Sequence, residues 1–299
     1  MTKRILVLAS AVALVWTACS SASPAPSTTT TPVTPTSATS PRGVTGGSST
    51  TTTETPGVAP SGLRTRKQGV LIVGTERLGV PWYIGPDADR VSGGFEFDVA
   101  AELARRLGVP AVKVVTTSLV LMMGGQDCKC DIMLSGITIT DSRARTLDLS
   151  EPYLSADQGV LVRKGTSLTT PTTAAALRWG IALHNSTGLD LLQTHVKPTV
   201  EPAVVVNEDE AVQRLVRGGV DAVLMDTPEA IAIANANPGL AVAGQFKTGE
   251  QYTVALSLGS PNTAIVNDAM RDMRGDGTLD TLLRAYFGID PSKLPALSS

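Results

Sequence analysis

The sequence predicts an α/β protein whose folded part has two lobes. Short apolar strands alternate with amphipathic helices between residues 70 and 287. The alternation occurs in two successive sets, separated after Arg143, and the 299-residue chain is long enough to form two modest cores. Ligands of such sheets bind beyond the carboxyl ends of the strands, where the segment 136–143 and Asp226 lie.

The first set has the order β-α-β-α-β. In its first helix the apolar residues Val99, Leu103 and Leu107 recur at helical spacing, and Gly108 is a C-terminal cap. Two glycines, Gly124 and Gly125, end the second helix. The expected elements are 70–74, 97–107, 112–115, 119–123 and 132–134.

The second set again alternates strands and helices, and a strand and two helices follow it. The expected strands are 159–162, 180–183, 203–206, 222–224 and 252–256. The expected helices are 188–196, 209–217, 228–235, 262–274 and 279–287.

The chain opens with the pattern of an export signal. Lys3 and Arg4 precede an apolar run over 5–16, and Ala18 precedes Cys19, which predicts a signal peptide at 1–18. The run is shorter than the ~20 residues that a membrane-spanning helix needs, so no transmembrane segment is expected in the mature protein. Cys19 resembles the lipidated cysteine of bacterial lipoproteins. A secreted protein cleaved nearby is the alternative.

Residues 19–62 are dominated by Thr, Ser, Pro and Gly and are expected to form a disordered tether, because they contain too little apolar surface to offset ordering entropy. The formal net charge of the chain is −2 and no basic stripe interleaved with aromatics is present, which argues against nucleic acid as a partner.

The segment 131–143 suits a carboxylate. An apolar strand leads into Gly136, Thr138 and Arg143. Glycine allows close approach, the threonine hydroxyl donates a hydrogen bond, and the arginine fork can bind two oxygens. A strand end with an N-cap and a surface arginine is the structural alternative.

Five ordered blocks, from residue 70 to 289, resemble the solute-binding proteins of ABC importers for polar amino acids, known as solute-binding protein family 3. The similarity is strongest to the glutamine-binding branch. The blocks are 94–108, 131–143, 149–153, 219–228 and 276–288.

This resemblance implies a periplasmic-binding-protein (venus flytrap) fold with a discontinuous first lobe at 63–155 and 252–290. The second lobe would be 156–251, and two hinge strands would lie near 155–159 and 250–253. The implied protein is a lipid-anchored monomer on the outer face of the bacterial cytoplasmic membrane. It would have no cofactor or metal and would pass a free amino acid to the permease subunits of an importer.

The resemblance also implies residue roles. The α-carboxylate of the ligand would be held by Gly136, Thr138, Arg143 and the turn Thr187-Gly188, and the α-ammonium by Asp226. Opposite charges at two ends of a closing cleft suit a zwitterion, since both interactions strengthen as water leaves.

Side-chain selectivity departs from the family. Gly79 and Ser118 stand where the two stacking aromatics are usual, and Trp82 or Tyr83 are the possible substitutes. We therefore expect a polar ligand side chain rather than an aromatic one.

Among the remaining side-chain contacts, Glu76 favours a cation, whereas His184 and Met225 stand where glutamine binders contact the side chain, and His184 suits an amide or an acid. Alternatively, Glu76 pairs with its neighbour Arg77 and recognises no ligand.

Cys128 and Cys130 form a Cys-X-Cys pair, for which a local disulfide and two free thiols are both possible. Because no activated nucleophile is evident, we expect a binding protein rather than an enzyme. The alternatives are an exported dehydratase-like enzyme on the same fold and a sensor or scaffold whose cleft has degenerated.

Overall fold

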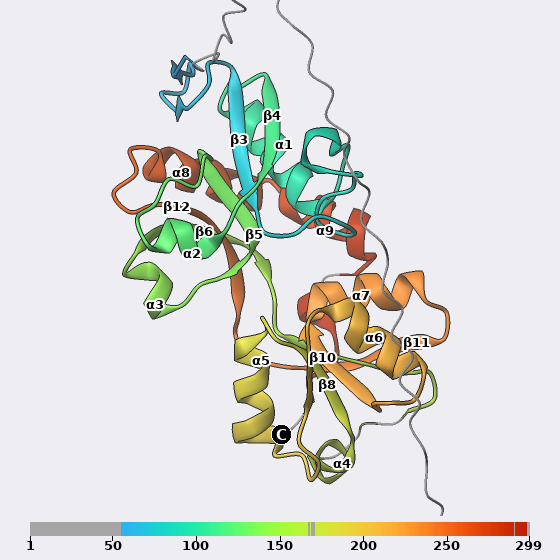
Figure 1. The fold of residues 1–299 in the computed structure, drawn as a ribbon. Coiled ribbons are helices and arrows are strands. Elements are labelled where there is room, and N and C mark those ends of the chain that lie inside the picture. The colour runs from blue at the N-terminus through green and yellow to red at the C-terminus, as the bar shows by residue number, and fades with distance from the viewer. Residues whose placement is uncertain (1–54, 167, 169–170, 290, 298–299) are drawn as a thin grey trace, which may run out of the picture. The chain divides into compact units, whose positions relative to one another are not determined.

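The computed structural model describes residues 55–166, 168, 171–289 and 291–297, which form two α/β lobes (Figure 1). The first lobe is built on a mixed sheet with the strand order β4-β3-β5-β12-β6. Strands β3, β4 and β5 are parallel, whereas β12 is antiparallel to both β5 and β6. The strand bounds are β3 Val70–Thr75, β4 Ala111–Thr116, β5 Ile132–Thr138, β6 Leu147–Ser155 and β12 Gln251–Ser257.

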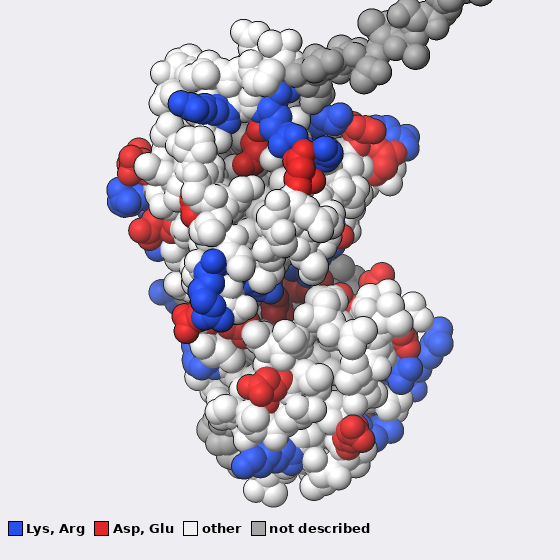
Figure 2. Space-filling model, turned by 60° about the vertical axis from the view of Figure 1, so that its left-hand side comes forward, with Lys and Arg blue, Asp and Glu red and all other residues white. Residues whose placement is uncertain are grey.

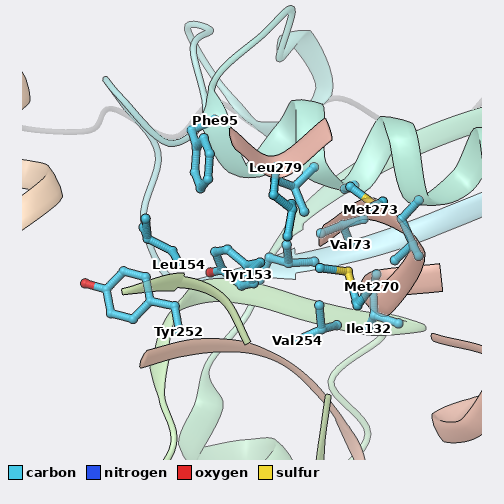
Figure 3. Close-up of a cluster of buried hydrophobic side chains, with 14 of the residues drawn as sticks. Val73, Phe95, Ile132, Tyr153, Leu154, Tyr252, Val254, Met270, Met273 and Leu279 are labelled. Atoms are coloured by element: carbon cyan, nitrogen blue, oxygen red, sulfur yellow. The ribbon is translucent and has the colours of Figure 1, made fainter. Parts of the chain in front are cut away.

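Helices pack on this sheet through apolar faces. Phe95 of α1 and Met270 of α8 are almost completely buried in one cluster with Tyr153 and Tyr252 (Figure 3), and Phe287 of α9 belongs to the same cluster. Burial of each such side chain contributes about 1.5–3 kcal/mol to the hydrophobic stabilisation. The helices of this lobe are η1 Ala88–Arg90, α1 Phe95–Arg106, α2 Leu119–Met123, α3 Asp141–Ala144, α8 Thr263–Gly275 and α9 Thr278–Phe287.

The second lobe has the strand order β11-β7-β10-β8-β9, in which β10, β8 and β9 are parallel and β7 is antiparallel to its two neighbours. Trp179 and Phe246 are central to its core. Its strands are β7 Gln158–Arg163, β8 Trp179–Ala182, β9 Ala203–Val205, β10 Ala222–Asp226 and β11 Leu240–Phe246. Its helices are α4 Pro171–Ala176, α5 Ser186–Leu191, the π-helical turn η2 Leu192–Val196, α6 Glu208–Val216 and α7 Thr227–Ala236.

Two chain crossings join the lobes, one from β6 to β7 and one from β11 to β12. The buried carboxylate of Asp157, in the first crossing, accepts hydrogen bonds from the backbone N–H groups of Thr248 (3.0 Å) and Gly249 (2.8 Å) in the second. Lys247 adds an ion pair to the same carboxylate at 3.1 Å. These bonds hold the two crossings side by side at the hinge.

Ordered structure begins earlier than the sequence predicts. The tether was expected to extend to residue 62, but β1 (Gly57–Val58) pairs antiparallel with β2 (Arg64–Thr65), and Leu63 is buried in the core. The predicted signal peptide at 1–18, Cys19 and most of the tether lie outside the described residues. In the described part of the chain, no helix has the length and hydropathy that a membrane span requires.

Candidate functional site

A cavity of about 410 Å³ lies between the lobes and contains many of the residues singled out by sequence (Figure 2 shows the surface hollowed there). The predicted residues that line it are Glu76, Gly136, Thr138, Arg143, His184, Thr187 and Asp226. Ser118 and Gly188 do not line it and lie directly behind residues that do.

Arg143 is placed by the end of β5 and the start of α3. The Thr140 hydroxyl accepts a hydrogen bond from the Arg143 backbone N–H at 3.2 Å and thereby caps α3. The Arg143 Nη1 donates to the Thr138 carbonyl oxygen at 2.7 Å, which fixes the guanidinium at the edge of the cavity. Burial lowers the pKa of Arg143, while nearby acids including Glu76 favour its charged form. The group is therefore a fixed cation suited to a carboxylate.

Asp226 ends β10 on the opposite lobe, immediately before α7. Its Oδ1 accepts a hydrogen bond from Gln158 Nε2 at 2.8 Å, and its Oδ2 accepts one from the Tyr252 hydroxyl. Burial and the neighbouring Asp226 raise the pKa of Tyr252 well above its ordinary value, so the hydroxyl remains a donor. Asp226 is thus oriented by residues of both hinge-proximal strands, β7 and β12.

A hydrogen-bonded chain extends from Asp226 toward the second-lobe turn. Gln158 Nε2 also donates to Glu250 at 3.1 Å, and the Thr187 hydroxyl donates to the other oxygen of Glu250 at 2.9 Å. Asn185 donates to Gln158 at 2.8 Å and accepts from the Gly188 N–H at 2.8 Å, which caps α5. The Gly188 N–H therefore has a partner within the protein, and Thr187 is the member of the pair that faces the cavity.

Gly136 has a φ of +58°, a left-handed conformation that favours glycine. Its N–H donates to Glu96 Oε1 at 2.7 Å rather than into the cavity. A Cβ at this position would lie 2.3 Å from Arg77 Nη2 and 3.2 Å from the Tyr252 ring. The space expected for an approaching ligand is used in part by Arg77.

Glu76 faces the cavity and also anchors α2. Its Oε1 accepts hydrogen bonds from the Leu119 N–H (2.8 Å) and the Ser118 hydroxyl (3.1 Å). Ser118 therefore acts on the site through Glu76. The alternative pairing of Glu76 with Arg77 does not occur, because Arg77 reaches Glu229 of α7 instead, with 3.4 Å between Nη1 and Oε2.

Neither possible aromatic substitute offers a stacking surface. Trp82 and Tyr83 are 2% and 0% exposed, and the Arg77 guanidinium lies 5.2 Å from the centre of the Trp82 ring. The Tyr83 hydroxyl donates to the Leu134 carbonyl oxygen at 2.9 Å within the first lobe. Neither ring therefore presents its face to the cavity, and the apolar part of the wall comes from Leu119 and Ile137 instead.

His184, on the second lobe, pairs with Glu208 at the start of α6, with 2.5 Å between Nε2 and Oε1. The hydrogen bond that His184 donates to Glu208 raises the pKa of His184. Burial opposes ionisation of Glu208, yet the bond to His184 holds the pKa of that carboxyl below its usual value. Their hydrogen bond therefore favours the protonated form of His184 and the ionised form of Glu208 at the cavity wall.

Sequence reasoning missed several residues that line the cavity: Arg77, Leu119, Ser135, Ile137, Asn185, Ser186, Asn207 and Glu208. Asn207 had a readable signal, since it precedes three acidic residues as the N-cap of α6, and its side chain accepts from Glu210 N–H. No feature of the sequence indicated that Glu229, which contacts Arg77 across the cleft, would lie beside the site.

A second, larger cavity of about 720 Å³ lies at the hinge side of the second lobe, between α5 and the C-terminal segment. It shares Ser186 and Thr187 with the first cavity but contains neither Arg143 nor Asp226. Its walls include Lys247, Phe246 and Leu297. Opposite charges also line this second cavity, on Lys247, Asp190 and Glu250, but Arg143 and Asp226, the residues expected to hold the two charges of the ligand, line only the first of the two.

Cys128 and Cys130 form a disulfide just before β5. Both are buried and pack in an apolar cluster with Leu119 and Met122 of α2. Among the described residues, no group of three or more His, Cys, Asp or Glu side chains is placed to hold a metal ion.

Comparison with known proteins gives a consistent result. Residues 71–289 match the family model described as bacterial extracellular solute-binding proteins, family 3. The chain is 30% identical over 233 residues to the L-cystine-binding protein TcyJ of Escherichia coli, covering 77% of this chain and 87% of that protein. It is 25% identical over 205 residues to the ABC transporter glutamine-binding protein GlnH of Bacillus subtilis, covering 67% of this chain and 74% of that protein.

Two of the solved structures that this chain resembles are those of ancestral proteins. One is an ancestral cationic amino acid solute-binding protein, with a TM-score of 0.63 and 29% identity over 73% of this chain and 96% of that chain. The other is an ancestral arginine-binding protein bound to glutamine, with a TM-score of 0.61 and 30% identity over 74% of this chain and 99% of that chain.

Proposed function

This chain belongs to family 3 of the bacterial extracellular solute-binding proteins, and on that basis we propose that its cleft captures a polar amino acid outside the cytoplasm for delivery to an ABC importer. The relatives named above are binding proteins for cystine, glutamine and cationic amino acids. Their ligands share the α-amino acid group and differ in the side chain. Capture rather than catalysis is therefore the function we propose.

The observation that carries this proposal is the placement of opposite charges on opposite lobes. Arg143 and Thr138 line the cavity on the first lobe, and Asp226 lines it on the second. An α-carboxylate bound to Arg143 and an α-ammonium bound to Asp226 would bridge the lobes. Closure of the lobes then excludes water and strengthens both interactions.

The polar wall of the cavity supports a polar side chain. Glu76, His184 and Glu208 line it, whereas Trp82 is covered by Arg77. An aromatic ligand would lose about 0.5–1.5 kcal/mol for each ring contact that the missing aromatic residues would have supplied. We therefore expect phenylalanine, tyrosine and tryptophan to bind more weakly than polar amino acids.

The test is a thermal-shift screen of the purified mature protein against the proteinogenic amino acids and L-cystine. A ligand present at a hundredfold excess over its Kd stabilises the folded state by about 2.7 kcal/mol. We expect stabilisation by one or more polar amino acids, and its loss in the Arg143→Ala variant. If no amino acid stabilises the wild-type protein, or an aromatic one does so most strongly, the proposal is wrong.

We further propose the cellular context and the domain limits. A signal peptide at 1–18, lipidation at Cys19 and a tether that ends before β1 (Gly57–Val58) would hold the folded domain on the outer face of the cytoplasmic membrane. The lobe limits proposed are 57–155 with 252–290, and 156–251. The protein would act as a monomer that docks on permease subunits.

A further inference from the structure

The cleft contains a cation that belongs to the protein itself, the guanidinium of Arg77. We propose that Arg77 substitutes for the cationic side chain of a ligand, and that it thereby sets the cleft to prefer a neutral polar amino acid over arginine and lysine. This inference rests on the proposed function, since it concerns selectivity among amino acids.

The Arg77 guanidinium lies where the cationic side chain of a bound ligand could otherwise lie. It follows β3, lines the cavity, and keeps 25% of its side chain exposed. Its guanidinium lies 5.2 Å from the centre of the Trp82 ring, which is within the range of a cation–π contact. A ligand cation that used this ring would have to displace Arg77.

The acids around Arg77 complete a cation-binding environment. Burial disfavours the charged form of Arg77, but Glu229 of the second lobe, 3.4 Å away, together with Tyr252, Glu96 and Asp226, raises the pKa of Arg77 well above its ordinary value. Of these, Glu96 is already bonded to Gly136 and to the Tyr153 hydroxyl. The negative charge that would attract a lysine or arginine side chain is therefore compensated before a ligand binds.

The other carboxylates of the cavity wall also have partners among the described residues. Glu208 is paired with His184, and Glu76 accepts two hydrogen bonds at the start of α2. Asp226 is the acid we assign to the ligand ammonium. A second ligand cation would have to break one of these interactions, whereas an uncharged amide side chain would not.

Gly136 makes room for this arrangement. A side chain there would place its Cβ 2.3 Å from Arg77 Nη2, so the end of the Arg77 side chain would have to shift from its present position. The glycine that the family resemblance associates with the ligand carboxylate thus also allows the Arg77 guanidinium to lie where it does. The residues Arg77, Gly136, Trp82 and Glu229 form one unit, which we call the internal cation site.

The first experiment is isothermal titration of the wild-type protein with L-glutamine, L-asparagine, L-arginine and L-lysine. We expect arginine and lysine to bind at least tenfold more weakly than the better of the two neutral ligands. If either basic amino acid binds as tightly as that neutral ligand, the inference is overturned. If none of these four ligands and no other amino acid binds, the proposed function itself is wrong. That result differs from a failure of the inference alone, in which a basic amino acid does bind tightly.

The second experiment removes the internal cation. In Arg77→Ala the ratio of the arginine Kd to the neutral-ligand Kd should fall at least tenfold, because the ring and Glu229 become available. Arg77→Gln, which keeps a polar side chain beside Glu229, guards against failure of the alanine variant to fold and should shift the ratio in the same direction. Arg284→Ala is the matched control, since it removes an exposed arginine of α9 outside the cavity. An unchanged ratio in folded Arg77 variants would contradict the inference.

Discussion

Removal of the negative charge at Asp226 is the most direct test of the proposed ammonium site. Asp226→Asn keeps the shape of the side chain and its capacity to bond with Gln158 and the Tyr252 hydroxyl. The unliganded fold should therefore be retained. The ligand ammonium, in contrast, would lose its counter-charge.

The magnitude follows from the geometry of an ion pair. Two unit charges about 4 Å apart interact by about 4 kcal/mol at the effective dielectric of about 20 that is typical near a protein surface. Because Asp226 is only partly buried, we expect a loss of about 3 kcal/mol, which corresponds to a Kd roughly a hundredfold weaker. A ligand concentration that stabilises the wild type by about 2.7 kcal/mol would stabilise the variant by only about 0.4 kcal/mol.

Isothermal titration measures the Kd, and thermal unfolding with and without ligand measures the stabilisation. Asp280→Asn is the matched control, because it removes the same charge from an exposed position in α9. An Asp226→Asn variant that binds the ligand as tightly as the control does would show that the ammonium is held elsewhere. Glu250, linked to Asp226 through Gln158, would then be the next residue to test.

Three further results are expected. Arg143→Lys should weaken binding by at least tenfold in the same titration, because lysine is a single point of charge and cannot offer the planar fork; equal affinity would refute bidentate binding. Burial raises the pKa of the Glu229 carboxyl from 4.5 to about 7. Between these two pH values the folded protein keeps the carboxyl proton, whereas the unfolded chain releases it. The free energy of unfolding should therefore fall as the pH rises from about 4.5 to 7. Glu229→Gln should make denaturant-unfolding stability less dependent on pH across that window, and an unchanged dependence would contradict this assignment. Cys19→Ser should move the protein from the membrane fraction to the medium, whereas a wild-type protein already wholly in the medium would refute lipidation.

The fold was largely readable because most elements have one apolar face at a regular spacing. The helix expected at 119–123 is α2, and Gly108 follows α1 with a φ of +71°, as its predicted capping role requires. Strands β6 and β11 were not predicted. Strand β6 contains Pro152, and both strands depart from a regular register, β11 at Gly244, so neither shows the simple alternation that identifies a strand.

The candidate site was readable where its residues follow strands, because strand ends converge at one edge of a sheet. Thr138, Arg143 and Asp226 are of this kind. The role of Arg77 could not be read in the same way. Sequence proximity suggested a pair with Glu76, but Glu76 accepts hydrogen bonds from Ser118 and Leu119, and the partner of Arg77 is Glu229 on the other lobe. Only the tertiary structure brings these residues together.

Gly136 combines two features, a left-handed backbone conformation and a position close to the Arg77 guanidinium. A glycine between a buried strand and a hydroxyl-bearing turn suggests close approach of a ligand, and its left-handed φ is consistent with that. In the structure its N–H is bonded to Glu96, and the volume beside it holds the Arg77 guanidinium. The α-carboxylate would then depend on Arg143 and Thr138 more than on Gly136, while Gly136 would govern selectivity through Arg77. Recognition of the amino acid group and discrimination among side chains would thus be separable by mutation, although both originate at the carboxyl end of β5.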